Sequence, residues 1–257
     1  MAVNISDAVK NTFGSLKTGV GKKLVGVFFL IQLLNLGATY LTGLEGSLLT
    51  MLGGLGSVIV GLAGIVVTIG GLRSFRSGEL EKDNFTDNLV WPIIRITGVN
   101  VVTAVFAYAA AAVFIIPAIM SIFGGATGAT SGLSALSSIG VTDLLLGLAG
   151  GVLGIAAAAY VTVTLLLAQP LIAIDNRRMF QALDESVQRT RGNKISILLT
   201  GIAVTAVYLV ALLAVSGATA LINPAASTAA AQLIVAPVFG PLFLSLLNYF
   251  SEELPEK

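Results

Sequence analysis

The sequence predicts an all-α polytopic membrane protein with about six transmembrane helices, cytoplasmic amphipathic helices, and both termini in the cytoplasm. The first observation is composition. The 257 residues are 56% hydrophobic and 11% charged, which leaves too little polar surface to enclose a soluble core of this size. The second is that the 14 Lys and Arg residues fall in alternate gaps between the hydrophobic stretches. Because short cytoplasmic loops are rich in Lys and Arg, this alternation predicts the orientation of the chain as well as the number of spans.

The positive charges form four groups along the chain. One precedes the first hydrophobic stretch, two occupy internal gaps, and one ends the chain. The intervening gaps contain no Lys or Arg, so we expect them on the outer side. The groups are Lys10, Lys17, Lys22 and Lys23; Arg73, Arg76, Lys82 and Arg95; Arg177, Arg178, Arg189, Arg191 and Lys194; and Lys257.

We expect a single integral membrane domain over residues 1–257, in which interfacial segments alternate with pairs of spans. Apolar residues at helical spacing over residues 5–20 are typical of a helix that lies in the membrane interface. The expected segments are an interfacial helix over 1–23, spans one and two over 24–72, a cytoplasmic segment over 73–95, spans three and four over 96–168, a cytoplasmic amphipathic helix over 169–194, spans five and six over 195–250, and a tail over 251–257.

The third span and its surroundings contain features that interrupt helices. Pro92 lies near its start and Pro117 near its end, where we expect kinks or ends. The Gly-, Ser- and Thr-rich segment 124–143 is predicted to be an outer loop. The sequence from Thr97 to Phe106 is similar to that from Thr200 to Tyr208 with one residue skipped. Either the chain contains three related units, each an inner segment followed by a helical hairpin, or the similarity of two Val-, Ala- and Thr-rich spans is due to chance.

The residues that usually perform chemistry in proteins are scarce. The absence of Cys excludes disulfides, thiolate metal ligands and iron–sulfur clusters, and the absence of His removes the imidazole base and metal ligand. No Asp, Glu, Lys or Arg lies at a predicted span centre, which argues against a pump driven by an intramembrane carboxylate. We therefore expect no catalytic residue, no cofactor and no metal site. The net charge of +1 gives no reason to expect nucleic acid as a partner.

Arg95 is the positive charge closest to the membrane interior. It follows Trp91 and Pro92 by about one helical turn. Its guanidinium could enter a cavity and meet Asn100 or a lipid phosphate. Alternatively, it could extend to the inner interface, with Trp91 as an aromatic anchor. The shallow depth favours the second interpretation.

The fourth span has a dense set of glycines with the spacing of two overlapping GxxxG patterns. Such faces allow helix backbones to approach closely where lipid removes the usual hydrophobic driving force. We expect packing within the chain, with packing between protomers as the alternative. A smaller face of this kind is predicted in the second span at Ser57, Gly61 and Gly64. The glycines of the fourth span are Gly147, Gly150, Gly151 and Gly154.

The segment after the fourth span has the pattern of an amphipathic helix. Asp175 or Asn176 could cap its start, Gly192 could end it, and Glu185 and Arg189 have the favourable i,i+4 order. Its arginines could bind anionic headgroups, dock a partner, or only fix the topology. The predicted apolar stripe comprises Met179, Phe180, Leu183 and Val187, and the arginines are Arg177, Arg178, Arg189 and Arg191.

This segment also has the form F-x-A-L-x-x-S-x-x-x-T-R-G-N after a Pro-containing span end, and it resembles a known family. The resemblance is to the multi-pass membrane domain associated with glycerophosphodiester phosphodiesterases, which is also found in stand-alone bacterial and archaeal membrane proteins. It implies a helical membrane module and no catalytic residue, because the soluble phosphodiesterase domain and its histidines are absent from this sequence. The matching positions are Pro170, Phe180, Ala182, Leu183, Ser186, Thr190, Arg191, Gly192 and Asn193.

These observations favour a non-enzymatic integral membrane module in the cell membrane. It would be a scaffold, an accessory subunit or a membrane-organising protein that binds membrane lipids, a protein partner or a second copy of itself. The candidate contacts are Arg95, Asn100 and the four arginines around the amphipathic helix. The alternative is a transporter or lipid-handling permease, with Arg95, Asn100 and Gln169 near a path and kinks at Pro117, Pro237 and Pro241.

Overall fold

The computed structural model describes residues 4–44, 46–124, 141–223 and 227–254. These residues form helices and no strand, and six of the helices are long and apolar enough to cross a membrane. The all-α polytopic class is therefore confirmed. The chain divides into two compact units, residues 1–99 with 166–257 and residues 100–165, which we describe in turn. The candidate spans are Gly19–Thr42, Ser47–Ser77, Val90–Met120, Leu145–Ala173, Lys194–Ala220 and Ser227–Glu253.

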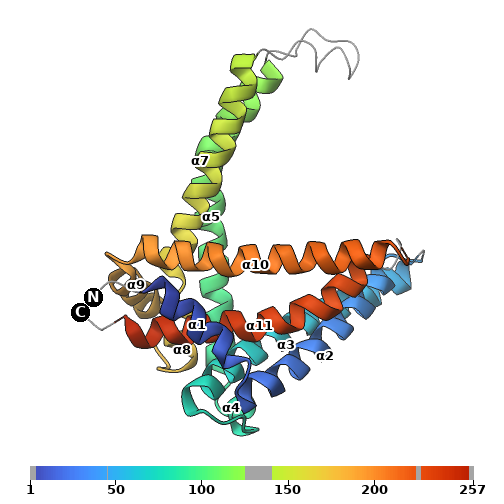
Figure 1. The fold of residues 1–257 in the computed structure, drawn as a ribbon, viewed down its shortest axis with the longest axis vertical. Helices are drawn as coiled ribbons and strands as arrows, with labels where there is room; N and C mark the ends of the chain where they lie inside the picture. The colour runs from blue at the N-terminus through green and yellow to red at the C-terminus, as the bar shows by residue number, and fades with distance from the viewer. Residues whose placement is uncertain (1–3, 45, 125–140, 224–226, 255–257) are drawn as a thin grey trace. The chain divides into compact units, whose positions relative to one another are not determined.

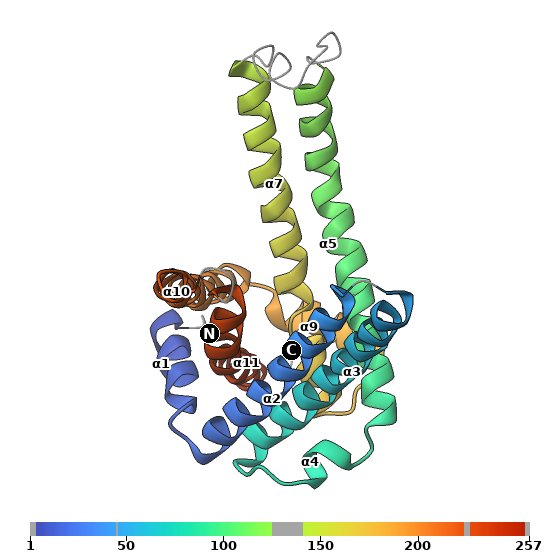
Figure 2. The same cartoon turned by 90° about the vertical axis from the view of Figure 1, so that its right-hand side faces the viewer.

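The first unit begins with α1 (Ile5–Ser15) and the hairpin of α2 (Gly19–Thr42) and α3 (Ser47–Ser77). The helix expected over 5–20 ends at Ser15, because Thr18 starts a new helix. The hydroxyl of Thr18 accepts a hydrogen bond from the Gly21 N–H at 3.0 Å, which is an N-cap. Figures 1 and 2 both show α2 and α3 side by side.

The α2–α3 hairpin packs through glycines near its turn. A Cβ on Gly53 would lie 2.5 Å from the Thr42 nitrogen, so only glycine permits this approach. A Cβ on Gly61 or Gly64 would have no atom within 4 Å, so the small face predicted around Ser57 is not the one that packs within the chain. The prediction is wrong here because the contacts lie at the two ends of α3. At the other end, Gly71 lies against Leu244 of a later helix.

The segment between α3 and the third span contains the short helix α4 (Asp83–Thr86). Gly78, with φ of +78°, ends α3 in the left-handed conformation, and its N–H donates to the Ser74 carbonyl at 3.0 Å. The next helix, α5 (Val90–Gly124), begins before the expected Ile96. Pro92 lies in its first turn, where backbone N–H groups have no intrahelical acceptor. The missing N–H of proline therefore costs no hydrogen bond there.

The rest of the first unit contains α8 (Ala168–Ala173), α9 (Met179–Thr190), α10 (Lys194–Ala220) and α11 (Ser227–Glu253). The last of these is the central helix. Half of its span is buried (50%), compared with 22% or less in the other five spans. It contacts α1, α2, α3, α8 and α10 (Figure 1). Pro237 and Pro241 lie inside it, both buried, without ending the helix.

A break separates α7 (Val141–Leu165) from α8, although both belong to one candidate span. Pro170 explains the break, because it cannot donate to the carbonyl four residues earlier and its ring crowds that carbonyl. The break therefore falls at Leu166 and Leu167. The Leu167 N–H donates instead to the buried hydroxyl of Ser186 on α9 at 3.1 Å. One position of the F-x-A-L-x-x-S motif thus accepts a hydrogen bond from a backbone N–H at this break.

The second unit contains α5 from Asn100 onward and α7, which lie side by side (Figure 2). Pro117 lies inside α5, which continues to Gly124. A Cβ on Gly150 would lie 2.8 Å from the Phe114 carbonyl oxygen, and one on Gly154 would lie 2.6 Å from Ile115 Cγ1. Gly151 has open space and Gly147 is half-buried. Two of the four predicted packing glycines therefore lie directly against α5 of the same chain.

The helix order has the form expected for three units. An interfacial or inner segment precedes each helical hairpin: α1 before α2–α3, α4 before α5–α7, and α9 before α10–α11. Most of the predicted outer loop between spans three and four, residues 125–140, lies outside the described residues.

Candidate functional site at the charged ends of the helices

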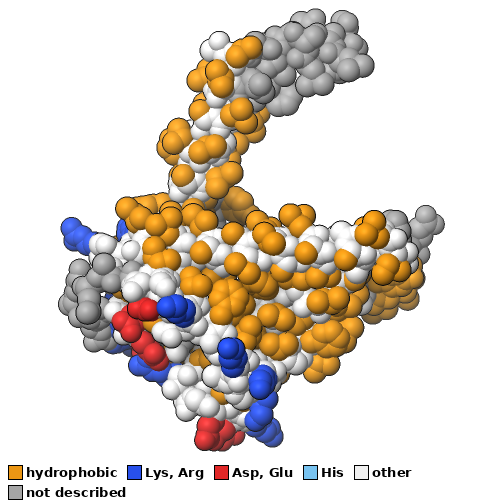
Figure 3. Space-filling model, in the orientation of Figure 1, with side chains coloured by type: hydrophobic (Ala, Val, Ile, Leu, Met, Phe, Trp, Pro, Cys, Tyr) orange, Lys and Arg blue, Asp and Glu red, His pale blue; other side chains and the backbone are white. Residues whose placement is uncertain are grey.

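Charged side chains of the first unit gather where its interfacial segments meet. Figure 3 shows them over the end that carries α1, α4 and α9, whereas hydrophobic side chains cover α10 along its length. Hydrogen bonds and an ion pair connect the end of α3 with the ends of α8 and α11, and connect α9 with the end of α11. The sequence pattern predicts these same segments on one side of the membrane.

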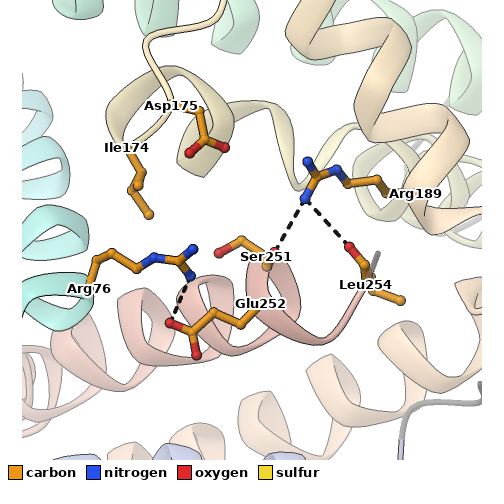
Figure 4. Close-up of a pocket in the computed structure, with 7 residues that line it drawn as sticks. All are labelled: Arg76, Ile174, Asp175, Arg189, Ser251, Glu252 and Leu254. Carbon is orange, nitrogen blue, oxygen red and sulfur yellow. Dashed lines mark hydrogen bonds and ion pairs between the residues drawn. The ribbon is translucent and has the colours of Figure 1, made fainter. Parts of the chain in front are cut away.

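A pocket of about 330 Å³ opens among these segments. Three spanning helices end around it, because Arg76 lies in the last turn of α3, Asp175 follows α8, and Glu252 lies at the end of α11. The pocket therefore lies at the ends of three candidate spans. Its lining residues are Arg76, Ile174, Asp175, Arg189, Ser251, Glu252 and Leu254 (Figure 4).

Arg76 and Glu252 form an ion pair along one wall of the pocket. Arg76 Nη1 lies 2.9 Å from Glu252 Oε1, and the two side chains are about half exposed (48% and 46%). Asn248 Nδ2 donates to the same carboxylate oxygen at 3.1 Å. Glu252 is therefore held from two sides, whereas most of the Arg76 donors remain available on the pocket side.

Arg189 forms the opposite wall and is buried, with 7% of its side chain exposed. Its Nε donates to Glu185 Oε1 at 3.0 Å, and its Nη2 pairs with the same oxygen. Its Nη1 donates to the carbonyls of Ser251 at 3.4 Å and Leu254 at 3.5 Å. A cation at these positions satisfies carbonyls that the end of α11 leaves without intrahelical donors. Arg189 thus joins α9 to the end of α11, and the predicted i,i+4 pair with Glu185 is confirmed.

Asp175 lines the pocket with an exposed side chain. Figure 4 shows its carboxylate pointing into the pocket, across from Arg76. No hydrogen bond or ion pair to this carboxylate occurs within the part of the chain that the structure describes. Each arginine of the lining already has a glutamate partner, so Asp175 is the acidic group of the pocket that lacks one.

Arg95 makes contacts that the sequence did not predict. Its Nη1 donates to the Asn176 carbonyl and side-chain oxygens, both at 2.9 Å, and to the Arg177 carbonyl at 3.2 Å. Asn176 lies in the loop between α8 and α9 and has a φ of +53°. The prediction that Asp175 or Asn176 caps α9 is wrong, because the N-cap is Arg178 without a side-chain cap bond. Asn100 lies in the second unit, at an exposed position of α5.

Arg73 has a structural role that sequence reasoning missed. Its Nε donates to the Ala173 carbonyl at 2.9 Å and its Nη1 to the Asp87 carbonyl at 2.7 Å. These bonds connect the end of α3 with the end of α8 and with the segment before α5. The sequence contains only a general indication of this role. The short helix α8 must leave carbonyls without intrahelical donors, and an arginine can donate hydrogen bonds to them.

The most buried face of α9 consists of small side chains, and the predicted apolar stripe is buried only in part. Ala182, Ser186 and Thr190 are fully buried, and all three belong to the sequence motif. Phe180 is 75% exposed and Val187 is 39% exposed. Gly192, with φ of +90°, follows the end of the helix as predicted. Met179 and Leu183 of the predicted stripe are half-buried, and Met179 lies against Gly98. The motif therefore specifies how α9 packs on its own chain, and Phe180 and Val187 remain at the surface.

A comparison with known protein families matches residues 14–249 to one described as "Domain of unknown function (DUF7847)". The chain belongs to this family. The DUF7847 match extends from the end of α1 into the last turns of α11, so it includes Arg76, Asp175 and Arg189 of the pocket. No curated protein and no solved structure matches the chain. The resemblance to the membrane domain of glycerophosphodiester phosphodiesterases stays a prediction.

Proposed function

We propose that this protein is a non-enzymatic module of the cell membrane that binds anionic lipid headgroups and thereby organises lipid around its charged end. The observation that carries the proposal is the exposure of Phe180 between arginines on a helix tied to the membrane. We call Arg178, Phe180, Val187 and Arg191 the α9 surface. All four are exposed.

The connectivity of α9 supports a position of the α9 surface at the membrane interface. Candidate spans directly precede and follow it, ending at Ala173 and beginning at Lys194. A helix of 12 residues between two spans must remain close to the headgroups, and apolar side chains on its free face can enter the interface. The arginines at its two ends then meet lipid phosphates.

The magnitudes indicate that the arginines decide which lipid is bound. Each Lys or Arg near an anionic membrane surface contributes about 1 kcal/mol of attraction. The spans already anchor the protein, so Phe180 adds little to overall membrane attachment. The charges distinguish anionic from neutral headgroups, and we therefore assign lipid selection to Arg178 and Arg191.

The double variant Arg178→Gln/Arg191→Gln tests this proposal. The protein is extracted from membranes of mixed lipid composition, and the lipids that remain bound are quantified by mass spectrometry. We expect the ratio of anionic to neutral lipid to be about thirtyfold lower in the double variant than in the original protein, from the loss of two charges at about 1 kcal/mol each. The control Arg178→Lys/Arg191→Lys keeps both charges and should keep the ratio. Retention of lipids in their bulk proportions by the original protein would refute the proposal.

The alternative of a transporter or lipid-handling permease has less support. Such a protein needs a polar path between its spans. The pocket formed by Arg76, Asp175 and Arg189 lies at the helix ends instead. Pro237 and Pro241, which could have marked a gate, are buried inside the continuous helix α11.

A further inference from the structure

We infer that the pocket binds a zwitterionic group that carries both a phosphate and an ammonium, with the phosphate on Arg76 and the ammonium on Asp175. A phospholipid headgroup or its free phosphoamine has this chemistry. The inference rests on the proposed function, because it adds a specific site to a protein that binds lipid headgroups. It concerns different residues from the α9 surface.

Arg76 is suited to the phosphate. Its side chain is half-exposed, and the one hydrogen bond that the structure gives it uses Nη1 and Glu252. A guanidinium has five N–H donors, so the others can bind phosphate oxygens in a bidentate manner. When Arg76 turns toward a phosphate, the hydrogen bond from Asn248 still holds Glu252 in place.

Asp175 is suited to the ammonium. Its carboxylate has only acceptors, points into the pocket and has no partner within the described ranges (Figure 4). An ammonium has three donors that need such acceptors. The second carboxylate oxygen of Glu252 can also accept a hydrogen bond from the ammonium, because Arg76 and Asn248 use Oε1.

Simple ions fit the pocket less well. A plain anion would meet the carboxylates of Asp175 and Glu252, and a plain cation would meet Arg76. A zwitterion satisfies both signs at once. Arg189 cannot serve as a second anion ligand, because Glu185 and the end of α11 occupy its guanidinium. A volume of about 330 Å³ is within the range of small-molecule pockets, which begins at roughly 300 Å³.

The test compares three lipids and one soluble compound. Purified protein in nanodiscs of mixed composition is analysed by native mass spectrometry for retained phosphatidylethanolamine, phosphatidylcholine and phosphatidylglycerol. Between the two zwitterionic lipids, we expect about tenfold preferential retention of phosphatidylethanolamine over phosphatidylcholine, because the quaternary ammonium of phosphatidylcholine has no N–H donors. Phosphatidylglycerol, which is anionic, reports on the α9 surface instead. Titration with phosphoethanolamine shows whether the free phosphoamine binds the pocket as well as the lipid does. Competition would identify the headgroup alone as sufficient, and binding of the lipid without competition would show that the ligand must be membrane-bound.

Isosteric variants assign the effect to the pocket. Asp175→Asn should abolish the preference for phosphatidylethanolamine, and Arg76→Gln should lower retention of this lipid about tenfold. Glu253→Gln removes a neighbouring exposed carboxylate that does not line the pocket, and it should change nothing. An unchanged preference in Asp175→Asn would overturn the inference. The Arg178/Arg191 variant is scored separately on anionic lipid, so failure of the pocket and failure of the proposed function can be told apart.

Discussion

The variant Arg189→Met is expected to lose about 3–5 kcal/mol of stability, the typical result of removing one partner from a buried ion pair. The methionine keeps the apolar stem but removes every donor. Among the residues that the structure describes, Glu185 then keeps Arg177, whose Nε lies 3.4 Å from its Oε2, and the carbonyls of Ser251 and Leu254 lose their charged donor. Unfolding in detergent, followed by circular dichroism, measures the change.

Arg191→Met is the matched control for this prediction. Arg191 lies two residues further along and is exposed. Removing a charge there should change stability by less than about 0.5 kcal/mol, as is usual for surface positions. Equal unfolding curves for Arg189→Met and the original protein would show that the connection between α9 and the end of α11 contributes nothing to the fold.

The second large effect is expected from Gly150→Ala. An added Cβ would meet Ala118 and lie 2.8 Å from the Phe114 carbonyl oxygen, so α5 and α7 must move apart. Such overpacking costs about 1–3 kcal/mol. Alanine by itself favours a helix over glycine by up to about 1 kcal/mol, so a measured loss of stability must come from the contact between the helices.

Gly151→Ala separates these two contributions. Gly151 is the next residue of the same helix, and no atom lies within 4 Å of a Cβ placed there. The same exchange should therefore leave thermal stability equal or slightly higher. If Gly150→Ala and Gly151→Ala had the same effect, close packing of α7 on α5 would not be the reason for the glycine at position 150.

The sequence was sufficient for the fold class because hydropathy and charge act over whole segments. Six apolar stretches separated by alternating Lys- and Arg-rich gaps leave few other arrangements. Helix ends were harder to predict, since single residues decide them. Thr18 begins a new helix within the segment expected to be continuous, and Pro170 divides α7 from α8.

The candidate site could be predicted only in part. The sequence identified the arginines around α9 but treated them alike, because spacing does not show which side of a short helix packs. The structure separates the buried Arg189 from the exposed Arg178 and Arg191. The pocket also needs Arg76 and Glu252, which are 176 residues apart in the chain and have no local pattern that connects them.

The same limit applies to packing faces. Small residues at helical spacing occur at Gly61 and Gly64 as well as at Gly150 and Gly154, and only the second pair meets another helix in this chain. Which face packs depends on the neighbouring helix and its side chains, and a pattern within one span does not contain that information.

The central claim is that the charged helix ends face the cytoplasm, where they meet the inner leaflet. The chain has no native cysteine, so single cysteines can report sidedness without background. In intact cells, a membrane-impermeant maleimide should label Asn223→Cys, in the turn between α10 and α11. It should leave Gln181→Cys, on α9, unlabelled until the membrane is permeabilised. Labelling of Gln181→Cys from outside intact cells would contradict the account.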